Sequence, residues 1–167
     1  MKKVILSAVA LLAFSFANAQ DDGGFQLGIH LGLPMGDVKD AYSFNAGVDL
    51  GYMWSAGEGF EVGVMTGYDN WFGKEQEFLG ETFDVDDAGF VPVAGALKYS
   101  VTENFFVGAD LGYALYVGSA DGGEGGFYYQ PKVGYQMPEV DVFVSYKGIS
   151  VDGGTFSAVG IGAAYKF

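Results

Sequence analysis

His30 is the only histidine in the chain, so it is the only side chain that could act as the base of a Ser-His-acid hydrolase. Ser43, Ser145 and several carboxylates could complete such a triad, but no nucleophile motif surrounds any serine. The chain has no cysteine, which excludes disulfide bonds, thiol nucleophiles and thiolate zinc sites. We therefore expect no catalytic site, no metal and no cofactor, with His30 hydrogen-bonded to a polar neighbour.

An acidic run between Lys74 and Asp87 is a second candidate for chemistry. Its carboxylates could bind divalent cations or a cationic partner. An EF-hand loop that began at Asp84 would need a bidentate Glu at its twelfth position, where the chain has Gly95. We therefore expect a solvated acidic loop rather than a calcium site. The acidic residues of this loop are Glu75, Glu77, Glu81, Asp84, Asp86 and Asp87.

Composition excludes several classes of protein. The net charge is −13 over 167 residues, and the only basic side chains besides His30 are scattered lysines. No basic stripe is available to neutralise a phosphate backbone, so we expect no nucleic acid partner. Half of the residues are hydrophobic and 17% are aromatic, far more than a disordered chain contains. The length allows one folded domain that is rich in apolar residues.

Residues 1–19 have the pattern of a secretory signal peptide. Lys2 and Lys3 precede an apolar stretch, and Ala17-Asn18-Ala19 forms an A-x-A cleavage site. The apolar stretch, from Val4 to Phe16, is shorter than the ~20 residues that a membrane-spanning helix needs. We therefore expect cleavage of this leader and export of a mature domain that comprises residues 20–167.

Strict alternation of residue types runs through eight segments of the mature region. One face of each segment is uncharged and aliphatic or aromatic, whereas the other combines Gly and Ala with the charged residues. This sorting favours a barrel with lipid outside and a narrow polar interior, an eight-stranded antiparallel up-and-down transmembrane β-barrel of the all-β class. A lipocalin-like barrel with the two faces reversed is the alternative. The segments are 25–33, 43–54, 60–69, 90–99, 105–117, 126–136, 140–147 and 158–167.

The charges of the glycine-rich face should meet inside this barrel. Carboxylates and lysines are nearly balanced there, as a buried network requires, because an unpaired charge in a closed interior is costly. A narrow ion path is the alternative, but the interior of an eight-stranded barrel is just wide enough for side chains to fill. We expect a plugged interior with a polar network of His30, Asp49, Glu61, Asp69, Lys98, Asp110, Lys132, Asp141 and Lys147, with Lys166 near one rim.

Aromatic positions and connector lengths give the orientation. Outward aromatics collect at the two ends of the segments, with Tyr52, Trp54 and Phe60 at one end and Phe44 and Tyr68 at the other. Outer-membrane barrels have short periplasmic turns and longer extracellular loops, so we expect periplasmic termini and an extracellular acidic loop. The short connectors are 55–59, 100–103 and 137–139, and the longer ones are 34–41, 72–87, 118–125 and 149–154.

The leader, the eight segments, the stretch 128–135 and the closing stretch 160–167 resemble the outer membrane protein beta-barrel domain family, relatives of the OmpA/OmpX-type small barrels. The resemblance implies fold and location more strongly than an activity. It also implies that the barrel assembly machinery reads the last strand, through Val159, Ile161, Ala163, Tyr165 and Phe167. Pro92 and Pro131 remove donors from a sheet without edges, so we expect them at bulges or strand ends.

The sequence therefore predicts a monomeric outer-membrane protein of a Gram-negative-type cell, with a structural or adhesive role through acidic extracellular loops. Its expected partners are outer-membrane lipid and lipopolysaccharide, the barrel assembly machinery, and an unidentified loop partner. Divalent cations could bridge the carboxylates of the loops to the phosphates of lipopolysaccharide. One alternative is a barrel that binds or passes small hydrophobic molecules, which requires an apolar interior. The other is a lipid A-modifying enzyme that uses His30, which requires a site open to the outer leaflet.

Overall fold

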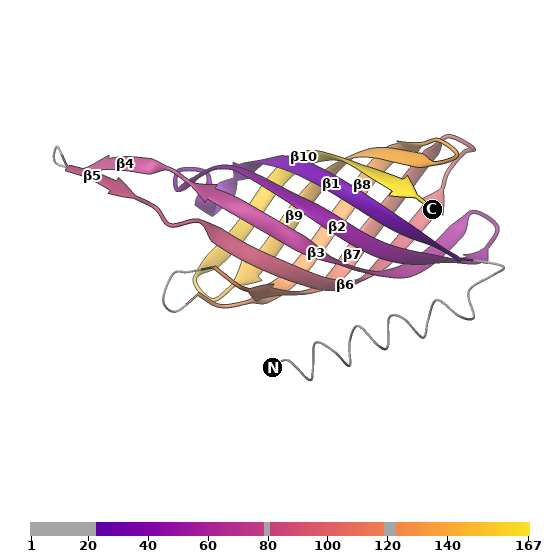
Figure 1. The fold of residues 1–167 in the computed structure, drawn as a ribbon, viewed down its shortest axis with the longest axis horizontal. Helices are drawn as coiled ribbons and strands as arrows, with labels where there is room; N and C mark the ends of the chain where they lie inside the picture. Colours follow the sequence, from indigo (N-terminus) through magenta and orange to yellow (C-terminus); the bar gives the residue numbers. More distant parts are fainter. Residues whose placement is uncertain (1–22, 79–80, 119–122) are drawn as a thin grey trace.

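The computed structural model describes residues 23–78, 81–118 and 123–167. Eight antiparallel strands close into a barrel in the order β1-β10-β9-β8-β7-β6-β3-β2 (Figure 1), which confirms the predicted fold. The described residues contain no helix that is long and apolar enough to cross a membrane. The predicted leader lies outside the described residues. The barrel strands are β1 (Gly23–Met35), β2 (Tyr42–Gly57), β3 (Phe60–Gly73), β6 (Ala88–Ser100), β7 (Phe105–Tyr116), β8 (Gly126–Gln136), β9 (Val140–Val151) and β10 (Gly154–Lys166).

Connections alternate between the two ends of the barrel. The short-turn end has the connections 58–59, 101–104 and 137–139, together with the start of β1 and the end of β10. The long-loop end has 36–41, which includes the 3-10 turn η1 (Gly36–Val38), and 74–87 and 117–125. The prediction of a fourth long connector, over residues 149–154, is wrong. Strands β9 and β10 pair as far as Val151↔Gly154 and leave only a turn at Asp152 and Gly153. Gly153 adopts a φ of 95°, which favours glycine in this turn.

The predicted acidic loop is a hairpin rather than an irregular loop. Strands β4 (Glu75–Phe78) and β5 (Glu81–Asp84) pair only with each other, and they project beyond the barrel (Figure 1). The pair Trp71↔Ala88 of β3 and β6 is followed in the same register by Glu75↔Asp84. β3–β4 and β5–β6 therefore form one long ribbon, the distal part of which has left the barrel wall.

Pro92 and Pro131 lie inside β6 and β8, so the expectation of bulges or strand ends is wrong. Pairing of β3 with β6 stops at Thr66↔Val93 and resumes at Asp69↔Phe90 without a change of register. The pairing of β8 with β9 has the same kind of gap beside Pro131. Each proline lacks an N–H group and costs hydrogen bonds on one side, while the pairs on either side of the gap keep the strands aligned.

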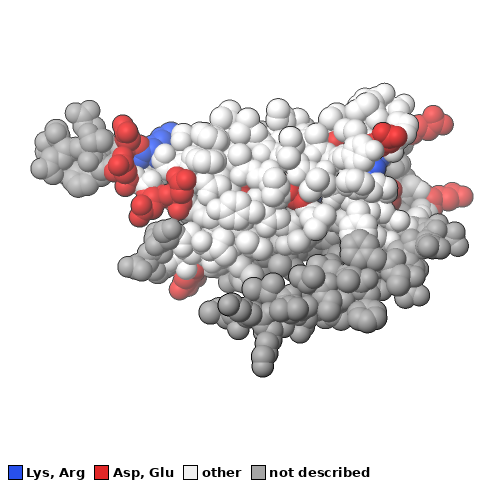
Figure 2. Space-filling model, viewed as in Figure 1, with Lys and Arg blue, Asp and Glu red and all other residues white. Residues whose placement is uncertain are grey.

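Exposure alternates along the strands as a barrel requires. Aliphatic and aromatic side chains point outward from every barrel strand. On the face shown in Figure 2, the Asp and Glu residues gather towards the two ends and leave a largely uncharged surface between them. Tyr52 shares the outward face with Phe25, its partner in β1, but it is buried by its neighbours. It packs against Phe25 and Trp54 at centroid distances of 4.6 and 4.8 Å, and Gly23 lies against its ring.

An aromatic plug fills the interior at the long-loop end. We define it as Tyr42, Trp71, Phe90, Tyr116 and Phe156. Phe156 lies at its centre, with ring centroids 5.4 Å from Trp71, 5.0 Å from Phe90 and 5.4 Å from Tyr42. Trp71 and Phe156 lie beyond the predicted ends of their segments, which is why the sequence pattern did not reveal the plug.

Candidate functional site

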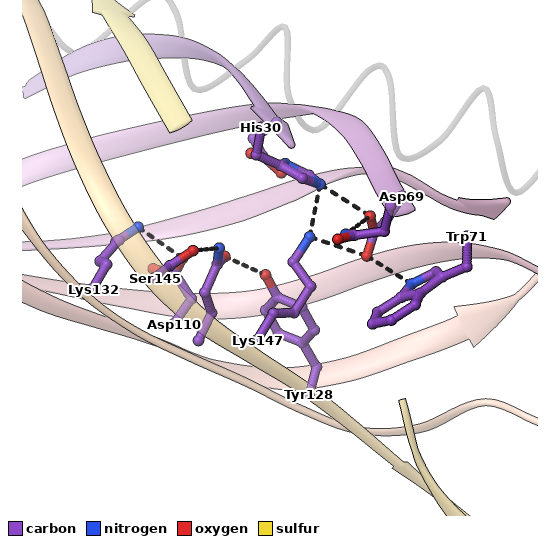
Figure 3. Close-up of polar contacts among 11 residues, drawn as sticks. His30, Asp69, Trp71, Asp110, Tyr128, Lys132, Ser145 and Lys147 are labelled. Carbon is purple, nitrogen blue, oxygen red and sulfur yellow. Dashed lines mark hydrogen bonds and ion pairs between the residues drawn. The ribbon is translucent and has the colours of Figure 1, made fainter. Parts of the chain in front are cut away.

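The inward-facing polar residues form a network along the barrel interior (Figure 3). Its first part joins β1, β2, β3 and β9 just below the aromatic plug. His30 contacts two carboxylates, with Nδ1 2.7 Å from Asp49 Oδ2 and Nε2 3.0 Å from Asp69 Oδ1. Lys147 Nζ lies 3.0 Å from Asp69 Oδ2 and 2.7 Å from His30 Nε2. Residues that are far apart in sequence thus meet because the barrel closes.

Asp69 is the most highly coordinated carboxylate of this part. Besides His30 and Lys147, it accepts hydrogen bonds from Asn45 Nδ2 at 2.8 Å and from Trp71 Nε1 at 3.1 Å. Its side chain is almost completely buried, so these donors replace the water that an ionised carboxylate would otherwise bind. Asp69 therefore joins the charged network to the aromatic plug.

The second part of the network lies nearer the short-turn end. Asp141 binds two lysines, Lys98 through Oδ2 at 2.6 Å and Lys166 through Oδ1 at 2.7 Å. Lys98 is also 3.4 Å from Glu61 Oε2. Lys166 further donates to the carbonyl of Met137 at 2.8 Å, which ties the last strand to the β8–β9 turn. A further ion pair joins Lys132 Nζ to Asp110 Oδ2 at 2.7 Å. With this pair, all nine residues predicted for the interior lie in the network.

Neutral inward side chains form their own hydrogen-bonded chain among the charged groups. Sequence reasoning considered Ser145 only as a nucleophile and did not single out Tyr128 or Gln130. The Tyr128 hydroxyl donates to Gln130 Oε1 at 2.6 Å, and Gln130 Nε2 donates to Ser145 Oγ at 3.0 Å. All three side chains are buried. Their inward positions in the alternation were the available signal, because a polar side chain on that face must find a partner.

Glycines make room for the larger inward side chains. A Cβ atom at Gly47 would lie 2.6 Å from His30 Cε1, and one at Gly162 would lie 2.5 Å from the Phe143 ring. These distances are shorter than non-bonded carbon contacts allow. The mixture of glycine and charge on one face is therefore a packing requirement of a narrow interior.

The geometry around His30 does not form a hydrolase triad. Among the described residues, no hydrogen bond joins a serine hydroxyl to His30; Ser145 Oγ binds Gln130, and Ser43 Oγ donates to the carbonyl of Phe72. The described residues also contain no group of three or more His, Cys, Asp or Glu that could hold a metal ion. What the arrangement can do chemically is satisfy buried charges and fix eight strands around them.

The acidic residues of the predicted loop lie on the projecting ribbon and at its base. Glu77 and Glu81 belong to β4 and β5. Glu75, Asp84, Asp86 and Asp87 are exposed. Asp87 has a structural role, because it accepts hydrogen bonds from the Gly73 N–H at 2.9 Å and from Asn70 Nδ2 at 3.1 Å, which fastens the base of the ribbon.

The residues predicted as the assembly signal lie at the closing seam. Val159, Ile161 and Tyr165 of β10 point outward and are exposed, and Ala163 has the same orientation in the alternation. Phe167 follows the strand, and its N–H donates to the carbonyl of Phe25 in β1.

The architecture is that of the small eight-stranded outer-membrane barrels, and the similarity lies in structure rather than in sequence. No protein-family model matches the chain. No curated protein sequence matches it either.

Three solved structures illustrate the similarity. Ail of Yersinia pestis, solved in complex with the heparin analogue sucrose octasulfate, has a TM-score of 0.57 and 16% identity, covering 87% of this chain and 98% of Ail. Neisserial surface protein A (NspA) has a TM-score of 0.52 and 13% identity, covering 87% of this chain and 97% of NspA. A de novo designed transmembrane β-barrel has a TM-score of 0.54 and 16% identity, covering 89% of this chain and 98% of the design. At these identities the comparisons establish the fold.

Proposed function

We propose that this protein is an exported, monomeric, non-enzymatic β-barrel of a Gram-negative-type outer membrane, with a structural interior and an interaction role on its long-loop end. In this proposal, both chain termini are periplasmic, and the assembly machinery recognises β10 during insertion. The uncharged outer surface supports membrane insertion, because a soluble barrel would expose charge around its circumference.

The projecting β4–β5 ribbon is the observation that supports an interaction role. It continues the β3–β6 register beyond the rim and pairs with no other strand of the described chain. A barrel that served only as a membrane plug would not need a hydrogen-bonded extension with several carboxylates. We propose that its partner is cationic, either a basic protein surface or divalent cations that bridge the ribbon to lipopolysaccharide phosphates.

The interior supports a structural role over the two alternatives. A barrel that bound or passed hydrophobic molecules would need an apolar path, but here salt bridges and the aromatic plug occupy the interior. A lipid A-modifying enzyme would need an accessible base, but His30 is buried between Asp49, Asp69 and Lys147.

A charge-neutralised ribbon tests the interaction role. In the test variant, five acidic residues become Gln or Asn, and Asp87 is kept because it fastens the ribbon base. The five are Glu75, Glu77, Glu81, Asp84 and Asp86. Cells with this variant should lose binding to a polylysine-coated surface and to lipopolysaccharide in Ca²⁺ relative to the native protein. The control neutralises Glu58, Glu103 and Glu139 at the short-turn end and should bind normally. Equal binding by the native protein and the ribbon variant, at equal surface amounts, would contradict the proposal.

A further inference from the structure

The interior contains a small chamber within the network, in the half nearer the short-turn end. It has a volume of about 50 Å³, and its lining combines charged side chains from β2, β6, β7, β8 and β9, and Gln26 and Gln130, with an equal number of apolar side chains. At the short-turn end of the network, Glu61 and Lys166 keep 36% and 23% of their side-chain surface exposed, whereas Asp69 beside the plug keeps 2%. The chamber is therefore a dead end that faces the short-turn side.

One carboxylate oxygen of the chamber has no partner. Asp110 is completely buried, and its Oδ2 binds Lys132 Nζ, but its Oδ1 makes no hydrogen bond. A buried, ionised oxygen without a donor is costly, so each such oxygen in a native interior calls for a partner.

The charges around the chamber indicate the sign of that partner. Asp69 is paired with Lys147 above the chamber. The remaining interior carboxylates are Asp49, Glu61, Asp110 and Asp141, and the remaining lysines are Lys98, Lys132 and Lys166. The lysines are one fewer than the carboxylates, so the chamber has a deficit of one positive charge when His30 is neutral.

We propose that the chamber binds one small monovalent cation, such as Na⁺ or K⁺, against Asp110 Oδ1. The volume accommodates such an ion with a retained water molecule. A divalent ion would exceed the deficit of one positive charge and would leave a net positive charge buried in the chamber. The ion would enter and leave at the short-turn end, past Glu61 and Lys166, without crossing the barrel.

The test is the thermal stability of the refolded barrel in detergent, measured in NaCl, KCl and choline chloride at equal ionic strength. Screening is then the same in all three salts, and only choline is too large for the chamber. We expect a higher Tm in NaCl or KCl that saturates with cation concentration, as binding to a single site of the folded state requires. Asp110→Asn should abolish the difference between salts, and Asp86→Asn, on the exposed ribbon base, should keep it.

Crystals of the unaltered protein grown in RbCl make the test independent of whether Asp110→Asn folds. An anomalous peak beside Asp110 Oδ1 is the expected result. Equal Tm values in the three salts, a salt difference that persists in Asp110→Asn, or an RbCl crystal without that peak would each overturn the proposal. Water, with a proton on His30, would then account for the chamber.

Discussion

The indole Nε1–H of Trp71 donates a hydrogen bond to Asp69 Oδ2 over 3.1 Å, and both side chains are buried. Among the described residues, this contact is the only hydrogen bond between the aromatic plug and the charged network, and both of its members come from β3. Packing of the plug and pairing of the charges are therefore mechanically coupled at one point of the barrel interior.

Asp69→Ala should be strongly destabilising. The change leaves Lys147 and His30 without their shared carboxylate and removes the acceptor of Asn45 and Trp71. Breaking a buried ion pair from one side costs about 3–5 kcal/mol. The measurement is urea unfolding of the barrel in lipid vesicles, followed by tryptophan fluorescence. The exposed carboxylate of Asp86 serves as the control, and an Asp69→Ala midpoint equal to that of Asp86→Ala would contradict the coupling.

Gly47→Ala should destabilise the barrel, whereas Gly95→Ala should be tolerated. The new methyl group at Gly47 would lie 2.6 Å from the His30 ring, but the nearest atom to a Cβ at Gly95 is 3.9 Å away. Overpacking of a rigid interior costs about 1–3 kcal/mol, and alanine in place of an outward glycine costs nothing in packing. Unfolding midpoints of the two variants provide the comparison. Equal midpoints would show that inward glycines are not needed for space.

Phe90→Ala combined with Phe156→Ala should open the plug. Phe156 contacts Tyr42, Trp71 and Phe90, so removal of both rings leaves the long-loop mouth closed only by neighbouring side chains. Planar bilayers should record no steady current for the native protein and cation-preferring currents for the double variant, because carboxylates outnumber lysines in the interior. Phe44→Ala, at an outward ring stacked on Phe72, is the matched control and should stay silent. A native protein that conducts as well as the double variant would contradict a plugged interior.

Deletion of residues 75–84 with a short Gly-Ser linker should leave the barrel intact. β4 and β5 pair only with each other, and the base of the ribbon is fastened separately by Asp87. The free energy of unfolding should change by no more than about 0.5 kcal/mol, the usual range for surface changes. Urea titration of the shortened protein gives this value. A large loss of stability would mean that the ribbon is part of the barrel's folding unit.

The eight strands, their faces and the inward positions of the charges followed from the sequence, because alternation has a period of two and the two environments differ strongly in polarity. The sequence did not predict which inward side chain contacts which. The Lys147–Asp69 pair depends on the stagger between strands distant in sequence, and no spacing in the chain encodes that stagger directly.

The ends of the strands were also not predicted correctly. Trp71 and Phe156 extend the alternation past charged and glycine-rich positions that look like loop, so both the aromatic plug and the tight Asp152–Gly153 turn were missed. The acidic run was interpreted as a loop because Glu and Asp are poor strand formers. The register inherited from β3 and β6 outweighs that propensity.

The central claim, an outer-membrane barrel with a filled interior, is tested most directly by fractionation of the native host on a sucrose gradient, followed by gel mobility with and without boiling. We predict recovery in the outer-membrane fraction and a folded band that shifts on boiling, because the closed barrel resists detergent until heated. Recovery in the soluble periplasm with no shift would contradict the claim and would reverse the assignment of the lipid-facing and interior surfaces.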